Sequence, residues 1–465
     1  MPTKKRATSS KAPSSVTIRM YNVGFGDCFL LTFQYANEER HMLIDYGSTA
    51  APKNTTGKYM LEVANDIKGI CKGKLDILVA THRHRDHISG FATDGDATGK
   101  IIAALKPDHV IQPWTEDPAA EPTALIATTA TGGKPSEKEI TSHFLGSLND
   151  MHRLAGSVAE LASSGQLQAG SSTRKQLSFL GEDNLRNLSA VKNLMSMGST
   201  GTAHYVNAGM MLNDLLPGVN ITVLGPPTLK QSDSIRKERA KDPNEFWQFR
   251  SFWSSQSLAM GARLKSGARS VRLSAKQHPE ELYAPNVRWF IAQSRRIHAE
   301  QTLDLVRDLD SVMNNTSIIL LFEVGNRKLL FPGDAQIENW SYALNNQKWQ
   351  GLLKDVNLYK VGHHGSLNAT PRSLWKLFIN KGDEGAQDRL ETLCSTRSGK
   401  HGDARSGTEV PRALLVAELE KQSDFKSTES YRAPNKLSSD VTIEVAERVK
   451  NARRRNPASS TRHLR

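Results

Sequence analysis

The chain has 465 residues, a formal net charge of +13 and three cysteines. Its length alone suggests about three domains of ordinary size. The cysteines, Cys28, Cys71 and Cys394, are too few and too scattered for a disulfide framework and are typical of a reducing compartment. The longest apolar run, residues 318–322, is far too short to cross a bilayer, and residues 1–6 lack an apolar signal core. We therefore expect a cytoplasmic protein with no membrane partner.

The positive charge is concentrated near the two ends of the sequence. Residues 1–14 contain four lysines or arginines and residues 448–465 contain seven, with no acidic residue in either range. These charges account for eleven of the net thirteen, so the rest of the chain is close to neutral. We expect basic tails at 1–14 and 441–465, which either contact a polyanion or are simply solvated.

The first half of the sequence contains a dense group of metal-ligand side chains. Residues 75–79 are an apolar run that predicts a short buried strand. The turn after it carries His82, His84, Asp86 and His87. Two histidines one residue apart can point at one ion, while the aspartate and the next histidine can reach a second ion nearby. A histidine-rich surface turn is the alternative, but this spacing favours a two-metal centre.

The motif His-x-His-x-Asp-His after a strand resembles the signature of the metallo-β-lactamase superfamily. Residues 18–31 and 42–48 look like the opening strands of that fold. Their first turn, Val23-Gly24-Phe25-Gly26-Asp27, is most similar to the branch that contains phosphorylcholine esterases and the hydrolase domain of competence DNA-uptake proteins (ComEC-like). Asn22 departs from the aspartate often found there. The resemblance implies an α/β protein, an αββα sandwich.

Two downstream segments extend the resemblance. Residues 314–335 predict two apolar strands around a Gly-Asn turn, ending on Asp334. By resemblance Asp334 is a bridging carboxylate, which would hold two ions roughly 3.5 to 4 Å apart. Residues 356–366 predict another strand, which ends in His363 and His364. The resemblance implies that His364 completes the second metal site and leaves His363 facing the substrate.

One ligand that the resemblance leads us to expect is missing. Many members of the superfamily have a histidine just before the hairpin that carries the bridging aspartate, but residues 308–315 contain none. The first ion could take Asp310, His298, His204 or only water instead. The histidines favour two zinc ions, whereas oxygen ligands in the gap would favour manganese.

Other polar residues are expected around this centre. Asp45, at the end of a predicted strand, would orient a ligand. The resemblance implies that the loop at 395–402 closes over the site, and its basic side chains would either bind a phosphate or remain flexible. The predicted metal ligands are His82, His84, Asp86, His87, Asp334 and His364; the predicted catalytic residues are Asp86, His363 and His401; and the predicted surrounding or substrate-binding residues are Asp27, Asp45, Asn315, Ser317, Ser366, Arg397 and Lys400.

The motifs span residues 20 to 366, so the predicted hydrolase domain is a single unit, 15–440. It is interrupted by insertions at about 116–200 and 228–313, and the long insertion between the two halves is expected to be mostly helical.

The sequence predicts a metal-dependent hydrolase, namely a phosphodiesterase or nuclease in which two divalent ions activate a hydroxide. The expected partner is nucleic acid, DNA rather than RNA. Because a fold does not fix a substrate, two alternatives remain open. One is a small-molecule hydrolase acting on a lactone, an ester or a cyclic nucleotide. The other is a metal-stabilised module that binds a protein partner through its insertions.

Overall fold

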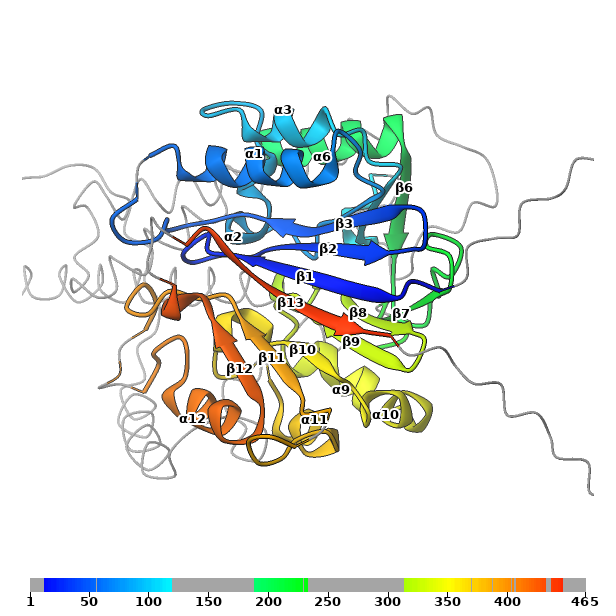
Figure 1. Ribbon diagram of the computed structural model, residues 1–465, viewed down its shortest axis with the longest axis vertical. Coiled ribbons are helices and arrows are strands. Elements are labelled where there is room, and N and C mark those ends of the chain that lie inside the picture. The colour runs from blue at the N-terminus through cyan, green and yellow to red at the C-terminus, as the bar shows by residue number, and fades with distance from the viewer. Residues whose placement is uncertain are drawn as a thin grey trace, which may run out of the picture.

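The computed structural model describes residues 12–118, 188–232 and 313–445, apart from 56, 229, 369, 387, 403, 405–406 and 432–435. These residues form two mixed β-sheets that pack face to face, with helices on the outer face of each (Figure 1). The predicted α/β class is confirmed.

The first sheet has seven strands in the order β13-β1-β2-β3-β4-β5-β6. The part from β13 to β3 is antiparallel, and the part from β3 to β6 is parallel. Its strands are β1 (Ser15–Tyr21), β2 (Cys28–Gln34), β3 (Glu39–Tyr46), β4 (Ile77–Val79), β5 (His109–Pro113), β6 (Thr202–Val206) and β13 (Ser438–Glu444).

The second sheet has six strands in the order β12-β11-β10-β9-β8-β7. Its strands are β7 (Val219–Gly225), β8 (Ile319–Val324), β9 (Arg327–Phe331), β10 (Leu358–Lys360), β11 (Glu391–Cys394) and β12 (Asp424–Ser427). The predicted hairpin is present as β8 and β9, because Val324 pairs with Arg327 and leaves a two-residue turn. Gly325 has a φ of 57°, which a residue without a side chain adopts at little cost.

The helices form the two outer layers (Figure 1). Over the first sheet lie α1 (Tyr59–Cys71), α3 (Thr98–Ala103) and α6 (Leu188–Thr200). Over the second sheet lie α9 (Ile337–Leu344), α10 (Gln347–Leu353), α11 (Arg372–Leu377) and α12 (Ala413–Gln422). Short helical turns lie in the connections: α2 (Arg85–Ile88), η1 (Ser89–Phe91), η2 (Trp114–Glu116), η5 (Gly362–Gly365) and η6 (Thr428–Ser430).

Successive residues of a strand point to opposite faces of its sheet, and here both faces are covered. In β2, Phe29 and Phe33 belong to the core between the sheets, whereas Leu30 packs toward the helices. The ring centroids of Phe29 and Phe331, from facing sheets, are 5.8 Å apart in an edge-to-face arrangement. These strands therefore appear in the sequence as continuous apolar runs and not as alternating ones.

The structure corrects two predicted boundaries. Residues 441–444, predicted as part of the basic tail, continue β13, in which Val441 pairs with Ile18 of β1. Residues 188–200, predicted as part of an insertion, form α6, whose Leu194 and Met197 belong to the same core cluster as the buried face of α1. The remaining insertion residues, 119–187 and 233–312, lie outside the described ranges, so the helical insertion stays a prediction.

Within the described ranges, no helix combines the length and apolar character needed to cross a membrane.

Candidate metal centre

The predicted ligands lie at the carboxyl ends of strands in both sheets. The turn after β4 carries His82 to His87, the turn after β9 carries Asp334, and η5 follows β10 with His363 and His364. Because β9 and β10 are parallel neighbours, their following turns meet at one edge of the second sheet. The face-to-face packing of the sheets then brings this edge to the turn after β4.

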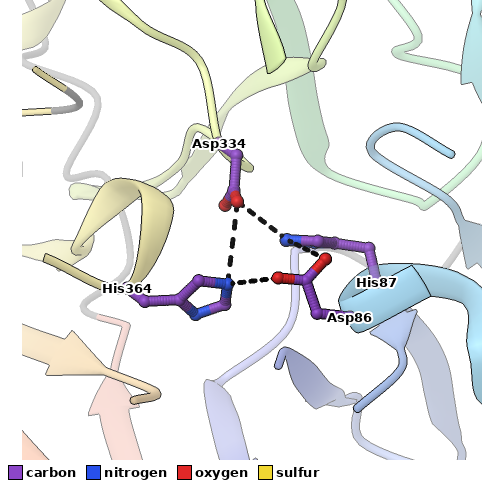
Figure 2. Close-up of side chains that lie close together, drawn as sticks. All are labelled: Asp86, His87, Asp334 and His364. Carbon is purple, nitrogen blue, oxygen red and sulfur yellow. Dashed lines mark hydrogen bonds and ion pairs between the residues drawn. The ribbon is translucent and has the colours of Figure 1, made fainter. Parts of the chain in front are cut away.

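Four side chains from these turns converge in one small volume: Asp86, His87, Asp334 and His364 (Figure 2). One ligand atom from each lies within 4.8 Å of the others, and all four residues are buried. His87 Nε2 is 3.0 Å from Asp334 Oδ2. His364 Nε2 is 3.1 Å from Asp86 Oδ2 and 3.6 Å from Asp334 Oδ2. Two imidazoles and two carboxylates are a suitable donor set for a divalent metal ion.

The outer nitrogens of both imidazoles are already bound to acceptors. His87 Nδ1 is 2.7 Å from Asp45 Oδ2, and His364 Nδ1 is 2.9 Å from the carbonyl oxygen of Ser395. A neutral imidazole has one N–H, so donation through Nδ1 leaves Nε2 with a bare lone pair. Both lone pairs then face carboxylate oxygens, which is repulsive without a cation between them. Hydrogen bonding of the far ring nitrogen is the usual support of a metal-ligating histidine, so these residues fit an ion.

The pKa shifts of His87 and His364 also indicate that positive charge is favoured at this centre. Burial opposes protonation of His87, but the carboxylates of Asp334, Asp45 and Asp86 outweigh it and raise the pKa of His87 well above its usual value. Burial likewise opposes protonation of His364, but Asp334 and Asp27 raise its pKa. The metal-free centre is therefore expected to hold protons where a bound ion would otherwise supply the positive charge.

Asp45 contacts two segments of the centre at once. Its Oδ1 accepts a hydrogen bond from the backbone N–H of Thr81 at 2.7 Å, and its Oδ2 accepts from the Thr81 hydroxyl at 2.7 Å. The same Oδ2 binds His87, as described above. Thr81 Oγ1 in turn lies 3.2 Å from His82 Nδ1. These contacts are the ones expected of a residue that orients ligands.

His82 and His84 lie beside the four converging residues. The ring centroids of His82 and His87 are 4.2 Å apart. His82 Nε2 is 3.0 Å from His84 Nδ1, and His84 Nδ1 is 3.1 Å from Asn314 Oδ1. The six predicted ligands therefore gather in one region as two adjoining groups. Asn314 was not predicted, because nothing in the sequence links it to His84, 230 residues earlier.

Lys360 is a second residue that the sequence interpretation missed. Its side chain is 2% exposed, and Nζ contacts Asp27, the carbonyl oxygen of Gly333 at 3.1 Å and Asp334 Oδ1 at 3.6 Å. Lys360 is the last residue of the fully buried strand β10. A lysine in a buried strand requires buried anionic partners, and this was the one available signal.

His363 and His401 were predicted as catalytic residues, and a protonated histidine could act as a general acid. His363 Nε2 is 3.8 Å from Asp334 Oδ2, and 24% of its side chain is exposed. The ring of His401 is 4.2 Å from Phe25, which is itself 4.4 Å from His364. Burial lowers the pKa of His363 to about 4 and that of His401 to about 3. Both are therefore neutral near pH 7, which does not favour either as a general acid.

The other predicted residues lie around the centre with different contacts. The Ser317 hydroxyl accepts from the backbone N–H of Asp334 at 3.3 Å. Asn315 Nδ2 is 3.5 Å from Glu338 Oε2, and the Ser366 hydroxyl is 3.5 Å from Asn368 Oδ1. Arg397 donates to the carbonyl oxygen of Ala51, and Lys400 is exposed on the same loop.

The structure also bears on the missing ligand. His204 lies on β6, and its Nε2 is 3.1 Å from Nδ1 of His109 on the neighbouring strand. Among the described residues it belongs to neither group of predicted ligands, so this alternative is not supported. Asp310 and His298 lie outside the described residues.

No family model matches this sequence, and no curated protein matches it. Among solved structures, the chain is similar to a mutant of the CmlA beta-hydroxylase, with 9% sequence identity and a TM-score of 0.32. The match covers 92% of this chain and 54% of that one, so this chain spans about half the length of its structural neighbour. A likeness this distant does not identify an activity.

Proposed function

We propose that this protein is a metal-dependent hydrolase of the metallo-β-lactamase superfamily, from the branch resembling the competence DNA-uptake proteins, and that it cleaves phosphodiesters, DNA foremost. The observation that carries the proposal is the convergence of the Nε2 atoms of His87 and His364 on the carboxylates of Asp86 and Asp334. These four groups need positive charge between them, which either extra protons on the imidazoles or a bound metal ion can supply.

Divalent ions held here, zinc or manganese, would lower the pKa of a coordinated water and neutralise charge that develops on a substrate oxygen. The protein's own residues would prepare the site. Asp45 and the Ser395 carbonyl fix the tautomers of the two histidines, and Ser317 holds the backbone of Asp334. Asp334 has two carboxylate oxygens, of which Oδ2 faces His87 while Oδ1 lies nearer Lys360.

A phosphodiester substrate is favoured by polar and basic groups near the centre. The partly exposed His363 lies beside Asp334, and the loop that carries His401 also carries the basic residues Arg397 and Lys400. Cationic side chains bind phosphate by charge-assisted hydrogen bonds. The near-neutral body of the chain favours a second candidate, a hydrolase of small lactones, esters or cyclic nucleotides, since such substrates do not need an extended basic surface.

The test is a hydrolysis assay of the metal-supplemented full chain on single-stranded DNA, double-stranded DNA, RNA, bis-(para-nitrophenyl) phosphate and a simple lactone. We expect phosphodiester cleavage that Asp334→Asn reduces by at least about 100-fold, because losing even an outer partner of a metal ligand costs 10- to 100-fold. The matched control is Asp355→Asn, since that carboxylate is 53% exposed and forms a surface ion pair with Lys328. Lactone opening without phosphodiester cleavage would reject the substrate class, and full activity of Asp334→Asn would reject the site.

A further inference from the structure

Three buried ligand atoms meet beside the four-residue cluster, and one of them is an amide oxygen. His82 Nε2 lies 3.0 Å from His84 Nδ1, which lies 3.1 Å from Asn314 Oδ1. The three residues are 1%, 4% and 1% exposed. They come from the turn after β4 and from the segment that precedes β8, so the tertiary fold alone brings them together.

The hydrogen bonds around His82 fix which of its nitrogens faces this point. The Thr81 hydroxyl donates its proton to Asp45 Oδ2, so it can only accept from His82 Nδ1. A neutral His82 that donates through Nδ1 presents a bare lone pair at Nε2. Asn314 Oδ1 is also an acceptor. Two lone pairs therefore face the same nitrogen of His84, which has at most one proton to offer.

The four-residue cluster has the same feature, a histidine whose outer nitrogen is held by a hydrogen bond. Asp45 binds His87 directly and reaches His82 through Thr81, so a single carboxylate orients one imidazole in each group. Asn314 also lies where the sequence pattern lacks a ligand, because a histidine was expected just before the hairpin that begins with β8.

We propose that His82, His84 and Asn314 hold the first of the two metal ions and that the amide oxygen of Asn314 replaces the expected histidine. This inference rests on the proposed metal centre and adds an asymmetry to it. The first site would have two imidazoles and a neutral oxygen, whereas the second has two imidazoles and two carboxylates. A neutral amide oxygen is a harder donor than imidazole, so the first site would bind zinc more weakly and accept manganese more readily than it would with the expected histidine.

The experiment is an equilibrium titration of the chelator-treated full chain with zinc and with manganese, followed by calorimetry and by the manganese electron paramagnetic resonance signal. The wild type is expected to bind two equivalents, one tighter than the other. Asn314→Leu should weaken the looser equivalent by at least about 10-fold and leave the tighter one unchanged. Asn314→His should strengthen the looser zinc equivalent by at least about 10-fold, a gain that misfolding cannot produce.

The matched control is Asn220→Leu, the same change at an exposed position of β7. The inference is overturned if Asn314→Leu binds both equivalents like the wild type, or if it loses the tighter one. If Asp334→Asn still abolishes binding in that case, the proposed function stands and only the role of Asn314 fails. A wild-type protein that binds no metal overturns both.

Discussion

Asp45 shows how much of this centre depends on a residue outside the four converging ligands. It is 1% exposed, and its two oxygens bind Thr81 and His87. Replacement by asparagine would offer an N–H to a nitrogen that already carries one, and the imidazole would have to change tautomer or turn away. We expect Asp45→Asn to weaken metal binding by about 10- to 100-fold, as measured by calorimetry. Unchanged affinity in a folded variant would show that His87 needs no such support.

Lys360 tests the electrostatic side of the same centre. Its ammonium group is buried between Asp27 and Asp334, and removing one partner of a buried ion pair typically costs about 3–5 kcal/mol. We expect Lys360→Met to lower the free energy of unfolding of the metal-free protein by an amount of that order, measured by urea denaturation. The exposed control Lys72→Met, which removes only a surface pair with Glu39, should change stability by less than about 1 kcal/mol. Equal effects of the two variants would contradict the buried-pair interpretation.

The raised pKa values of His87 and His364 predict how metal binding depends on pH. In the metal-free protein both imidazoles stay positively charged at pH values above the usual histidine pKa. A metal ion must displace the extra proton in order to bind. Metal affinity should therefore rise with pH through neutrality, and binding should release protons. The stability of the metal-free fold depends on pH in the opposite direction. The protonated imidazoles contribute their full stabilisation below the histidine pKa of the unfolded chain. This contribution is lost as the pH rises through the raised pKa of the folded protein. Calorimetry in buffers of different ionisation enthalpy measures the release, and none at pH 7 would contradict these shifts.

The residue scale also shows what a sequence pattern can and cannot reveal. His82 to His87 were recognisable because they are adjacent, and Asp334 and His364 because each follows an apolar strand. Asn314 and Lys360 were missed because their significance lies in their proximity to His84 and Asp27, which are distant in the sequence.

At the scale of elements, the connection after β3 is packed directly against α2. A Cβ on Gly47 would lie 2.5 Å from the backbone carbonyl carbon of Asp86 and from the backbone nitrogen of His87. These are backbone atoms of the segment that carries two ligands, so the clash cannot be relieved by turning a side chain. We expect Gly47→Ala to displace α2 and to reduce metal affinity by at least about 10-fold, measured by calorimetry.

Gly351→Ala is the matched control, because none of the described residues has an atom within 4 Å of a Cβ at that position of α10. A glycine-to-alanine change inside a helix should raise stability by roughly 0.5–1 kcal/mol and leave metal binding unchanged. If Gly47→Ala behaves like Gly351→Ala, the close packing of α2 does not matter for the centre.

The helices and strands that could be predicted are those with a clear hydrophobic pattern in their own sequence. The β8–β9 hairpin was predicted in full, because a Gly-Asn turn separates two apolar strands. The edge strand β6 was missed, since its first residues are exposed and its position is set by pairing with β5. Residues 441–444 of the edge strand β13 were assigned to a tail for the same reason, because only Val441 of the strand is buried.

At the scale of the whole molecule, the uneven distribution of charge makes a prediction about nucleic acid. Seven of the basic residues lie in 448–465, a range that contains no acidic residue. If this segment binds DNA, deleting 446–465 should weaken DNA binding and make it less dependent on salt, by roughly 0.9 in the logarithmic slope for each phosphate that is no longer neutralised. Fluorescence anisotropy at several salt concentrations measures this slope. An unchanged slope would show that residues 446–465 do not contact DNA, and it would favour a small-molecule substrate.

The most direct test of the metal centre is the anomalous scattering of zinc or manganese in crystals of the metal-loaded protein. We expect a strong peak enclosed by Asp86, His87, Asp334 and His364, with a second peak beside His82, His84 and Asn314. Fully loaded crystals with no anomalous peak among the first four residues would contradict the proposed centre.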